Sequence, residues 1–171
     1  RKPEGMWLPE TAVNLETAAL LAESGIRFII LSPWQAEALR PGKKWRQLGK
    51  EPAPSNRPFR LHGIGKDLAV FFYNHRLAEG ISFQHFLRDA ESLYMRLKEF
   101  ADPENRSHLI HTATDGEIYG HHEPFGDMCF AALVKRIHSR DDFELTNYAA
   151  YLDEFPPHEE VRLKSGEEDK G

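Results

Sequence analysis

The stretch Ile26-Arg27-Phe28-Ile29-Ile30-Leu31 decides the fold class of this chain of 171 residues. It is an almost continuous apolar run rich in isoleucine, which is typical of a parallel strand that is covered on both faces. A helix is expected before it, because Asn14 is a good N-cap for residues 15–24 and Gly25 suits the position after the helix end. This order of elements predicts an α/β fold with a mostly parallel sheet.

The same alternation continues along the chain. Further strands are expected at residues 68–73, 108–114 and 143–148, and further helices at 81–101, 126–138 and 149–155. Residues 32–60 contain five prolines, at positions 33, 41, 52, 54 and 58. This segment is therefore expected to be a long loop that holds one short helix at 34–39.

Composition limits the classes of function and the compartment. The formal net charge of −5 at pH 7 argues against a nucleic-acid binder, which needs a basic face. No stretch reaches the roughly 20 apolar residues of a membrane span. Cys129 is the single cysteine, which favours a reducing, cytoplasmic compartment. Residues 1–160 are expected to form one domain, and residues 161–171 a charged, flexible tail.

The segment Trp7-Leu8-Pro9-Glu10 is the first candidate for chemistry. It places a carboxylate in a loop after a short strand, three residues from a tryptophan. Aromatic faces stack on sugar rings, and a carboxylate can act at the anomeric carbon. Trp34, which follows the strand at 26–31, is a second candidate for stacking. The alternative interpretation is a surface glutamate beside a core tryptophan.

The second candidate is the segment 114–122, Thr-Asp-Gly-Glu-Ile-Tyr-Gly-His-His. Loops so dense in polar groups after a strand often carry function, although a polar turn capped by Asp115 is the alternative. The candidate sugar-binding residues in and before this segment are His111, Glu117, Tyr119, His121 and His122.

Three kinds of chemistry could use this second segment. A metal site on His121 and His122 would require a turn, because adjacent side chains on an extended chain point to opposite faces. Serine hydrolysis lacks its G-x-S-x-G motif. A pair of carboxylates, one from each segment, fits best, since glycoside hydrolysis needs two such groups and no cofactor.

Together these two segments resemble motifs of glycoside hydrolase family 57, and the likeness is strongest over residues 5–31 and 111–125. It is nearest to a prokaryotic branch with a long extra C-terminal region. In that family a W-x-x-E segment carries the nucleophilic glutamate, and a later D-G-E-x-F/Y-G segment carries the acid/base aspartate. The resemblance assigns these roles to Glu10 and Asp115. Trp7 and Tyr119 match the aromatic positions of the two motifs.

One departure from the family is informative. Its members begin with a strand that bears a His-Gln-Pro motif, and no such motif occurs in this chain. The family fold is an incomplete (β/α)7 barrel, so the resemblance implies the second half of that barrel, with the N-terminal strands missing. The missing part of the barrel is then an expected partner, because half a barrel exposes a sheet edge.

The resemblance implies a retaining hydrolase or glucanotransferase that acts on α-linked glucans, of the α-amylase or 4-α-glucanotransferase type. Glu10 would attack the anomeric carbon, and Asp115 would protonate the leaving oxygen and then activate water or a sugar. A general acid needs a raised pKa, from burial or from a nearby charge such as Glu117. Two alternatives stay open: a metal-dependent enzyme like the polysaccharide deacetylases, and a catalytically silent carbohydrate-binding or structural module.

Overall fold

The computed structural model describes residues 2–165, which form two compact units. Unit 1 comprises the described residues up to Tyr73 together with those from Tyr148 onward, and unit 2 comprises Asn74–Asn147. Each unit has its own cluster of buried apolar side chains. The domain expected over residues 1–160 is thus divided into two packing units.

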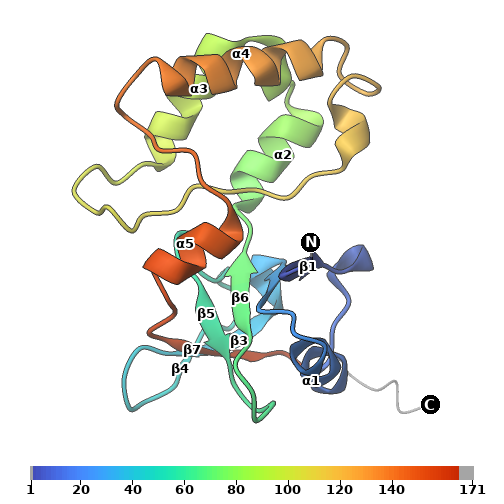
Figure 1. The fold of residues 1–171 in the computed structure, drawn as a ribbon, viewed down its shortest axis with the longest axis vertical. Helices are drawn as coiled ribbons and strands as arrows, with labels where there is room; N and C mark the ends of the chain where they lie inside the picture. The colour runs from blue at the N-terminus through green and yellow to red at the C-terminus, as the bar shows by residue number, and fades with distance from the viewer. Residues whose placement is uncertain (1, 166–171) are drawn as a thin grey trace. The chain divides into compact units, whose positions relative to one another are not determined.

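Unit 1 is built on a seven-stranded sheet with the order β1-β2-β6-β5-β7-β3-β4 (Figure 1). The strands are β1 (Gly5–Trp7), β2 (Phe28–Leu31), β3 (Ala36–Arg40), β4 (Arg46–Gln47), β5 (Phe59–Leu61), β6 (Ala69–Phe72) and β7 (Glu160–Leu163). The pairs β1–β2, β2–β6 and β5–β7 are parallel, whereas β5–β6, β3–β7 and β3–β4 are antiparallel. The predicted α/β class is confirmed, and parallel pairing prevails among β1, β2 and β6.

The three parallel strands are locked in register. Gly5 lies opposite Phe28, and Phe28 lies opposite Ala69, so the carboxyl ends of β1, β2 and β6 meet at one edge of the sheet. The glycine is required for this close packing, because a Cβ at Gly5 would lie 2.1 Å from the Phe28 ring. The turns that follow these strands therefore share one edge.

Both faces of β2 and β6 are covered, as the apolar run at 26–31 predicts. Ile29 and Leu31 pack in one cluster with Ala18 of α1 (Leu15–Glu23). On the other face, Tyr148 of α5 (Tyr148–Glu154) contacts the rings of Phe28 and Phe71, with centroids 5.4 and 4.9 Å away. This alternation is the period-2 pattern of a strand between two layers.

The expected caps of α1 are also confirmed. The side chain of Asn14 accepts a hydrogen bond from the backbone N–H of Thr17 at 2.8 Å. Gly25 follows the helix with a φ of +87°, a conformation that glycine adopts without steric cost. The short helix expected at 149–155 is found as α5, displaced by one residue.

The prediction for residues 32–60 was wrong. This segment contains β3, β4 and β5, and residues 34–39 form a 3-10 turn (Pro33–Gln35) and the start of β3. Alanine, glutamate and leucine favour helices, but pairing with β7 buries Ala36, Ala38 and Leu39 in the sheet. Tertiary pairing overrides local helix propensity here.

The prediction that a flexible tail begins at residue 161 is wrong for residues 161–163, which belong to a strand. Residues Glu160–Leu163 form β7, which lies between β5 and β3, and Val161 is fully buried. Apolar residues that alternate with charged ones are typical of a half-buried strand. In this segment the alternation is short and lies between other charged residues, so the sequence did not predict a strand. Residues 166–171 of the expected tail lie outside the described residues.

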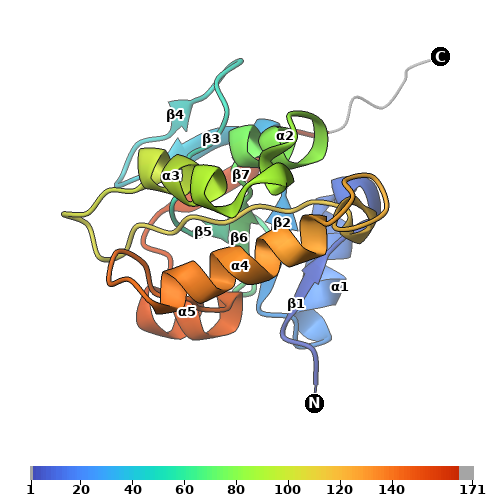
Figure 2. The same cartoon turned by 90° about the horizontal axis from the view of Figure 1, so that it is seen from above.

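Unit 2 contains α2 (His75–Phe83), α3 (Ala90–Phe100) and α4 (Gly126–His138), and Figure 2 shows them from a second side. The helix expected at 126–138 is confirmed. The single helix expected at 81–101 is wrong, because His85 adopts a left-handed φ of 58° and a 3-10 turn (Phe86–Arg88) follows. Asp89 then caps α3 by accepting a hydrogen bond from the N–H of Ser92 at 2.7 Å.

The strands expected at 108–114 and 143–148 are also wrong, since the described chain has no strand at either place. Ile110 and Phe143 instead pack against the helical core of unit 2. In that core Cys129 is buried, and burial raises the pKa of its thiol. Across residues 2–165, no helix combines the length and the apolar character that crossing a membrane requires.

The place of β7 in the sheet gives a test of the fold. Replacing Val161 by alanine should lower the free energy of unfolding by about 2 kcal/mol, because two buried methyl groups are lost and the space refills only in part. Urea unfolding of wild type and variant measures the difference. The exposed neighbour Lys164 provides the control, since K164A should change stability little. Equal effects of the two substitutions would mean that residues 161–163 are not part of the core.

Candidate functional site

Glu10 lies in a strained and exposed turn at the carboxyl end of β1. The turn is a short 3-10 segment (Pro9–Thr11) in which Glu10 has φ 53° and Thr11 has φ 52°. Left-handed backbone is unfavourable for residues with a Cβ, and most of all for a β-branched one. Such strain persists where the surroundings enforce it, and it is often found at functional sites.

The side chain of Gln35 holds this turn to the neighbouring one. Its amide nitrogen donates to the backbone oxygen of Thr11 at 2.8 Å, and its amide oxygen accepts from the N–H of Ser32 at 2.9 Å. Ser32 and Gln35 form a capping box around the turn that carries Trp34. The turns after β1 and β2 are therefore joined by one direct hydrogen bond, from Gln35 to Thr11.

The two tryptophans proposed for stacking, Trp7 and Trp34, are both accessible. Trp7 is 42% exposed at the end of β1, and Trp34 is 43% exposed in the turn after β2. Large apolar side chains with this exposure are available for stacking on a ligand. The structure thus places Glu10, Trp7 and Trp34 along one edge of the sheet of unit 1.

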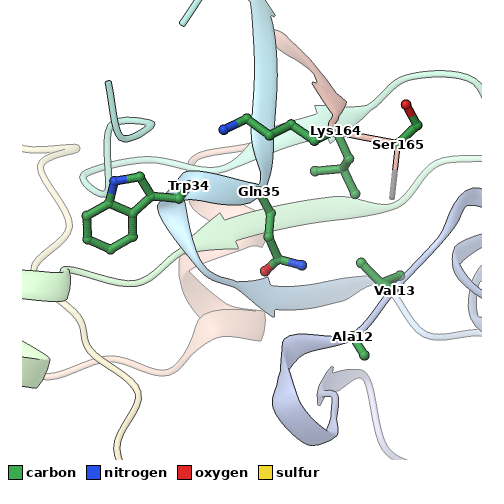
Figure 3. A pocket seen from close by; sticks show the side chains of 7 residues that line it. Ala12, Val13, Trp34, Gln35, Lys164 and Ser165 are labelled. Carbon is green, nitrogen blue, oxygen red and sulfur yellow. The ribbon is translucent and has the colours of Figure 1, made fainter. Parts of the chain in front are cut away.

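A hollow of about 370 Å³ lies beside these turns, lined by Ala12, Val13, Trp34, Gln35, Leu163, Lys164 and Ser165. Figure 3 shows the amide of Gln35 reaching toward Ala12 and Val13, whereas the indole ring of Trp34 points away from them. The ring of Trp34 therefore faces a different region from the apolar part of this hollow.

The second segment forms a compact turn in unit 2. Asp115 precedes a 3-10 turn (Gly116–Ile118) and is exposed, and its carboxylate makes no capping hydrogen bond to that turn. The alternative role as a capping aspartate is thus not realised. The hydroxyl of Tyr119 lies 3.0 Å from that of Thr114, and its ring packs edge-on against Phe130 at 5.5 Å between centroids.

The other predicted residues gather on or beside this turn. Glu117 forms an ion pair with His122 at 3.3 Å, and the rings of His121 and His122 lie edge-on with centroids 4.8 Å apart. The backbone oxygen of His111 accepts a hydrogen bond from the N–H of Asn74 at 3.1 Å. Within residues 2–165, no three side chains of the His, Cys, Asp or Glu type gather in a way that could hold a metal ion.

Sequence reasoning missed two residues of these turns. Gln35 was recognisable, because Ser32-Pro33-Trp34-Gln35 has the spacing of a capping box. Glu123 is buried and bonded to His85 and Arg88, which lie 38 and 35 positions earlier in the chain. No local pattern predicts such a partner, since the contact depends on how the helices of unit 2 pack.

The model of glycosyl hydrolase family 57 matches residues 1–164. The chain belongs to glycosyl hydrolase family 57. The predicted family resemblance is therefore confirmed over nearly the whole chain, although no curated protein sequence is similar enough to this one to count as a relative.

Solved structures show that this family 57 chain shares a fold with three enzymes from archaea. The 4-α-glucanotransferase of Thermococcus litoralis is 21% identical, with a TM-score of 0.71 over 94% of this chain. A branching enzyme of Thermococcus kodakaraensis is 16% identical (TM-score 0.69, 97% covered), and an exo-type maltose-forming amylase of Pyrococcus sp. ST04 is 18% identical (TM-score 0.61, 94% covered). The match spans 24, 42 and 28% of those three chains, respectively.

The strain at the Glu10 turn is measurable. Replacing Thr11 by glycine should raise the free energy of unfolding by about 0.5–1 kcal/mol. Left-handed backbone costs a residue with a Cβ roughly 1–2 kcal/mol, and the greater entropy loss of glycine on folding offsets about 0.5–1 kcal/mol of that gain.

The matched control is T17G, in the first turn of α1, where glycine should lower stability instead. Urea unfolding of both variants measures whether each substitution raises or lowers the free energy of unfolding. If T11G destabilises the protein as T17G does, the left-handed conformation at Thr11 is not a source of strain.

Proposed function

We propose that this chain carries the catalytic carboxylates of a retaining enzyme that acts on α-linked glucans. The observation that carries the proposal is a family 57 match over residues 1–164, combined with an exposed and strained turn at Glu10. The structurally similar proteins include a 4-α-glucanotransferase, an amylase and a branching enzyme, and these activities favour α-glucans as substrates.

Glu10 is proposed as the nucleophile. In parallel sheets active sites lie at the carboxyl ends of the strands, and the turn of Glu10 follows β1 at that edge. The carboxylate is exposed, so that a sugar can reach it. The hydrogen bond from Gln35 to Thr11 fixes the backbone beside it, as attack in a defined direction on the anomeric carbon requires.

Asp115 is proposed as the acid/base. Its side chain is exposed and is not used to cap the turn that follows it. Backbone hydrogen bonds to Glu117 from the N–H groups of His121 and His122, at 3.0 and 3.1 Å, close the turn behind it. In the first step the carboxylic acid would donate its proton to the leaving oxygen, and in the second the carboxylate would accept a proton from water or a sugar hydroxyl.

The remaining predicted residues are proposed as substrate contacts. Trp7 and Trp34 offer accessible indole faces for the apolar sides of glucose units. The polar contacts would come from the turn of unit 2 and the segment before it, namely from His111, Glu117, Tyr119, His121 and His122. Such groups fix the orientation of a sugar by hydrogen bonds to its hydroxyls.

Unit 1 is further proposed to be part of an incomplete (β/α)7 barrel. β1 is an edge strand, and among the described residues it pairs with β2 alone. Its Met6 and Trp7 side chains are 39 and 42% exposed. An exposed apolar edge calls for a covering element, and the missing N-terminal part of the barrel would supply one.

The choice between hydrolysis and transfer depends on the acceptor that reaches the glycosyl-enzyme. Water gives a hydrolase and a sugar hydroxyl gives a glucanotransferase, with the same two carboxylates. A metal-dependent deacetylase and a silent carbohydrate-binding module are the competing proposals, and the kinetic test below separates both from a retaining enzyme. A cytoplasmic location, without nucleic-acid or membrane partners, stays a prediction.

The two roles predict different substrate dependences. In the full-length protein, E10Q should lower kcat/KM at least about 10³-fold on both an α-1,4-glucan and α-maltosyl fluoride, because the attacking group is lost. D115N should lower kcat/KM about 10²–10⁴-fold on the glucan. On the fluoride, D115N should leave kcat/KM nearly unchanged, because fluoride departs without a proton.

Steady-state rates on both substrates measure this, and chromatography of the products separates hydrolysis from transfer. The matched controls are E16Q and D127N, which change exposed acids in the first turns of α1 and α4 and should keep wild-type rates. Full activity of E10Q on either substrate would refute the nucleophile, and equal losses of D115N on both would refute the acid/base.

A further inference from the structure

Glu123 is the charged side chain that unit 2 buries. Its residue is 6% exposed, and among residues 2–165 it is the single polar or charged residue that counts as buried. Removing a carboxylate from water costs several kcal/mol unless hydrogen bonds and opposite charges compensate it. Glu123 directly follows His121 and His122 in the sequence, so this buried carboxylate lies at the end of the turn that begins at Asp115.

Two side chains from the segment between α2 and α3 compensate the charge. His85 bonds one carboxylate oxygen through Nδ1, and Arg88 donates from Nε to the other at 3.0 Å. These bonds hold the pKa of Glu123 below its ordinary range. The bond from His85 has the largest effect, and the bond from Arg88 the next largest. Glu123 is therefore ionised, and both its carboxylate oxygens are hydrogen-bonded, so it is not available as an acid.

The backbone of Glu123 closes the turn that begins at Asp115. Its N–H donates to the oxygen of Ile118 at 3.1 Å, and its own oxygen accepts from the N–H of Gly126 at 3.0 Å, where α4 begins. Ile118 itself is buried in the core of unit 2. One residue thus connects the turn of Asp115 to the first turn of α4 and, through its side chain, to the segment before α3.

Left-handed residues flank Glu123 on both chain segments. His85 has φ 58°, and Phe125 has φ 62° although its ring is 74% exposed. Neither residue is glycine, so both conformations are unfavourable by themselves and persist because the surroundings enforce them. The carboxylate of Glu123 bonds the side chain of the first of these residues, His85. The backbone hydrogen bond from the N–H of Gly126 to the oxygen of Glu123 spans the second, Phe125.

We propose that Glu123 is a positioning residue for Asp115. Its buried ion pair fixes residues 115–123 and thereby the direction of the Asp115 carboxyl group. This inference rests on the proposed acid/base role of Asp115. Glu123 is not proposed to touch the substrate, because its side chain is buried and both its carboxylate oxygens are bonded, one to His85 and one to Arg88.

The test compares E123Q with a matched control in the full-length protein. The control is E91Q, because Glu91 also bonds two cationic side chains of unit 2, Arg136 at 2.8 Å and Arg140 at 3.1 Å, but lies on α3 away from the turn. E123Q should lower kcat/KM about tenfold on the α-1,4-glucan and leave kcat/KM on α-maltosyl fluoride nearly unchanged. E91Q should leave both values nearly unchanged.

Hydrogen exchange supplies a second measurement that does not depend on turnover. The backbone N–H groups of residues 118–123 are hydrogen-bonded within the turn, and E123Q should accelerate their exchange while E91Q does not. If Glu123 only stabilised the fold, E123Q would lower kcat/KM on both substrates in proportion to the stability it loses. This result would overturn the proposal. Unchanged exchange in E123Q, or an unchanged rate on the glucan, would also overturn it.

The variant D115N distinguishes failure of this inference from failure of the proposed function. If D115N loses the glucan reaction and E123Q keeps it, Asp115 is the acid/base but Glu123 does not position it. If D115N keeps the glucan reaction, the proposed function itself fails, and the inference about Glu123 fails with it.

Discussion

The parallel register of β1, β2 and β6 is the constraint on which the candidate site of unit 1 depends. It aligns the carboxyl ends of three strands, so that the turn of Glu10 and the turn of Trp34 begin at the same edge. Gly5 makes this alignment possible, because the ring of Phe28 occupies the space that a Cβ would fill. Gln35 then joins the two turns by a hydrogen bond to Thr11.

The two proposed catalytic turns are held by different physical means. In unit 1 the neutral, half-buried amide of Gln35 satisfies a backbone group in each of the two adjacent turns. In unit 2 a buried carboxylate, Glu123, bonds the partly exposed side chains of His85 and Arg88. Hydrogen bonds between neutral groups contribute about 1 kcal/mol each, whereas removing one member of a buried ion pair leaves a charge without compensation. The turn of Asp115 is therefore expected to be the more sensitive of the two to substitution.

The sequence predicted those parts of the structure that local patterns determine. The apolar run at 26–31, the cap at Asn14 and the helix at 126–138 are all present, and the two motifs led to the family. It failed where partners distant in the chain decide the outcome. In the polar segment 32–60, β3 forms because it pairs with β7, and β5 forms because it pairs with β6 and β7. The strand β7 is itself short and lies within a charged segment. The buried ion pair of Glu123 depends on the same kind of distant contact.

The central claim is that Glu10 becomes covalently bound to the sugar during turnover. The most direct measurement is mass spectrometry of the full-length protein after reaction with a 5-fluoro-α-glycosyl fluoride, a substrate whose glycosyl-enzyme breaks down slowly. The mass of one 5-fluoroglycosyl unit should be added to the protein, and peptide mapping should find it on Glu10. A label on another carboxylate, or turnover of the reagent without any labelled protein, would contradict the account.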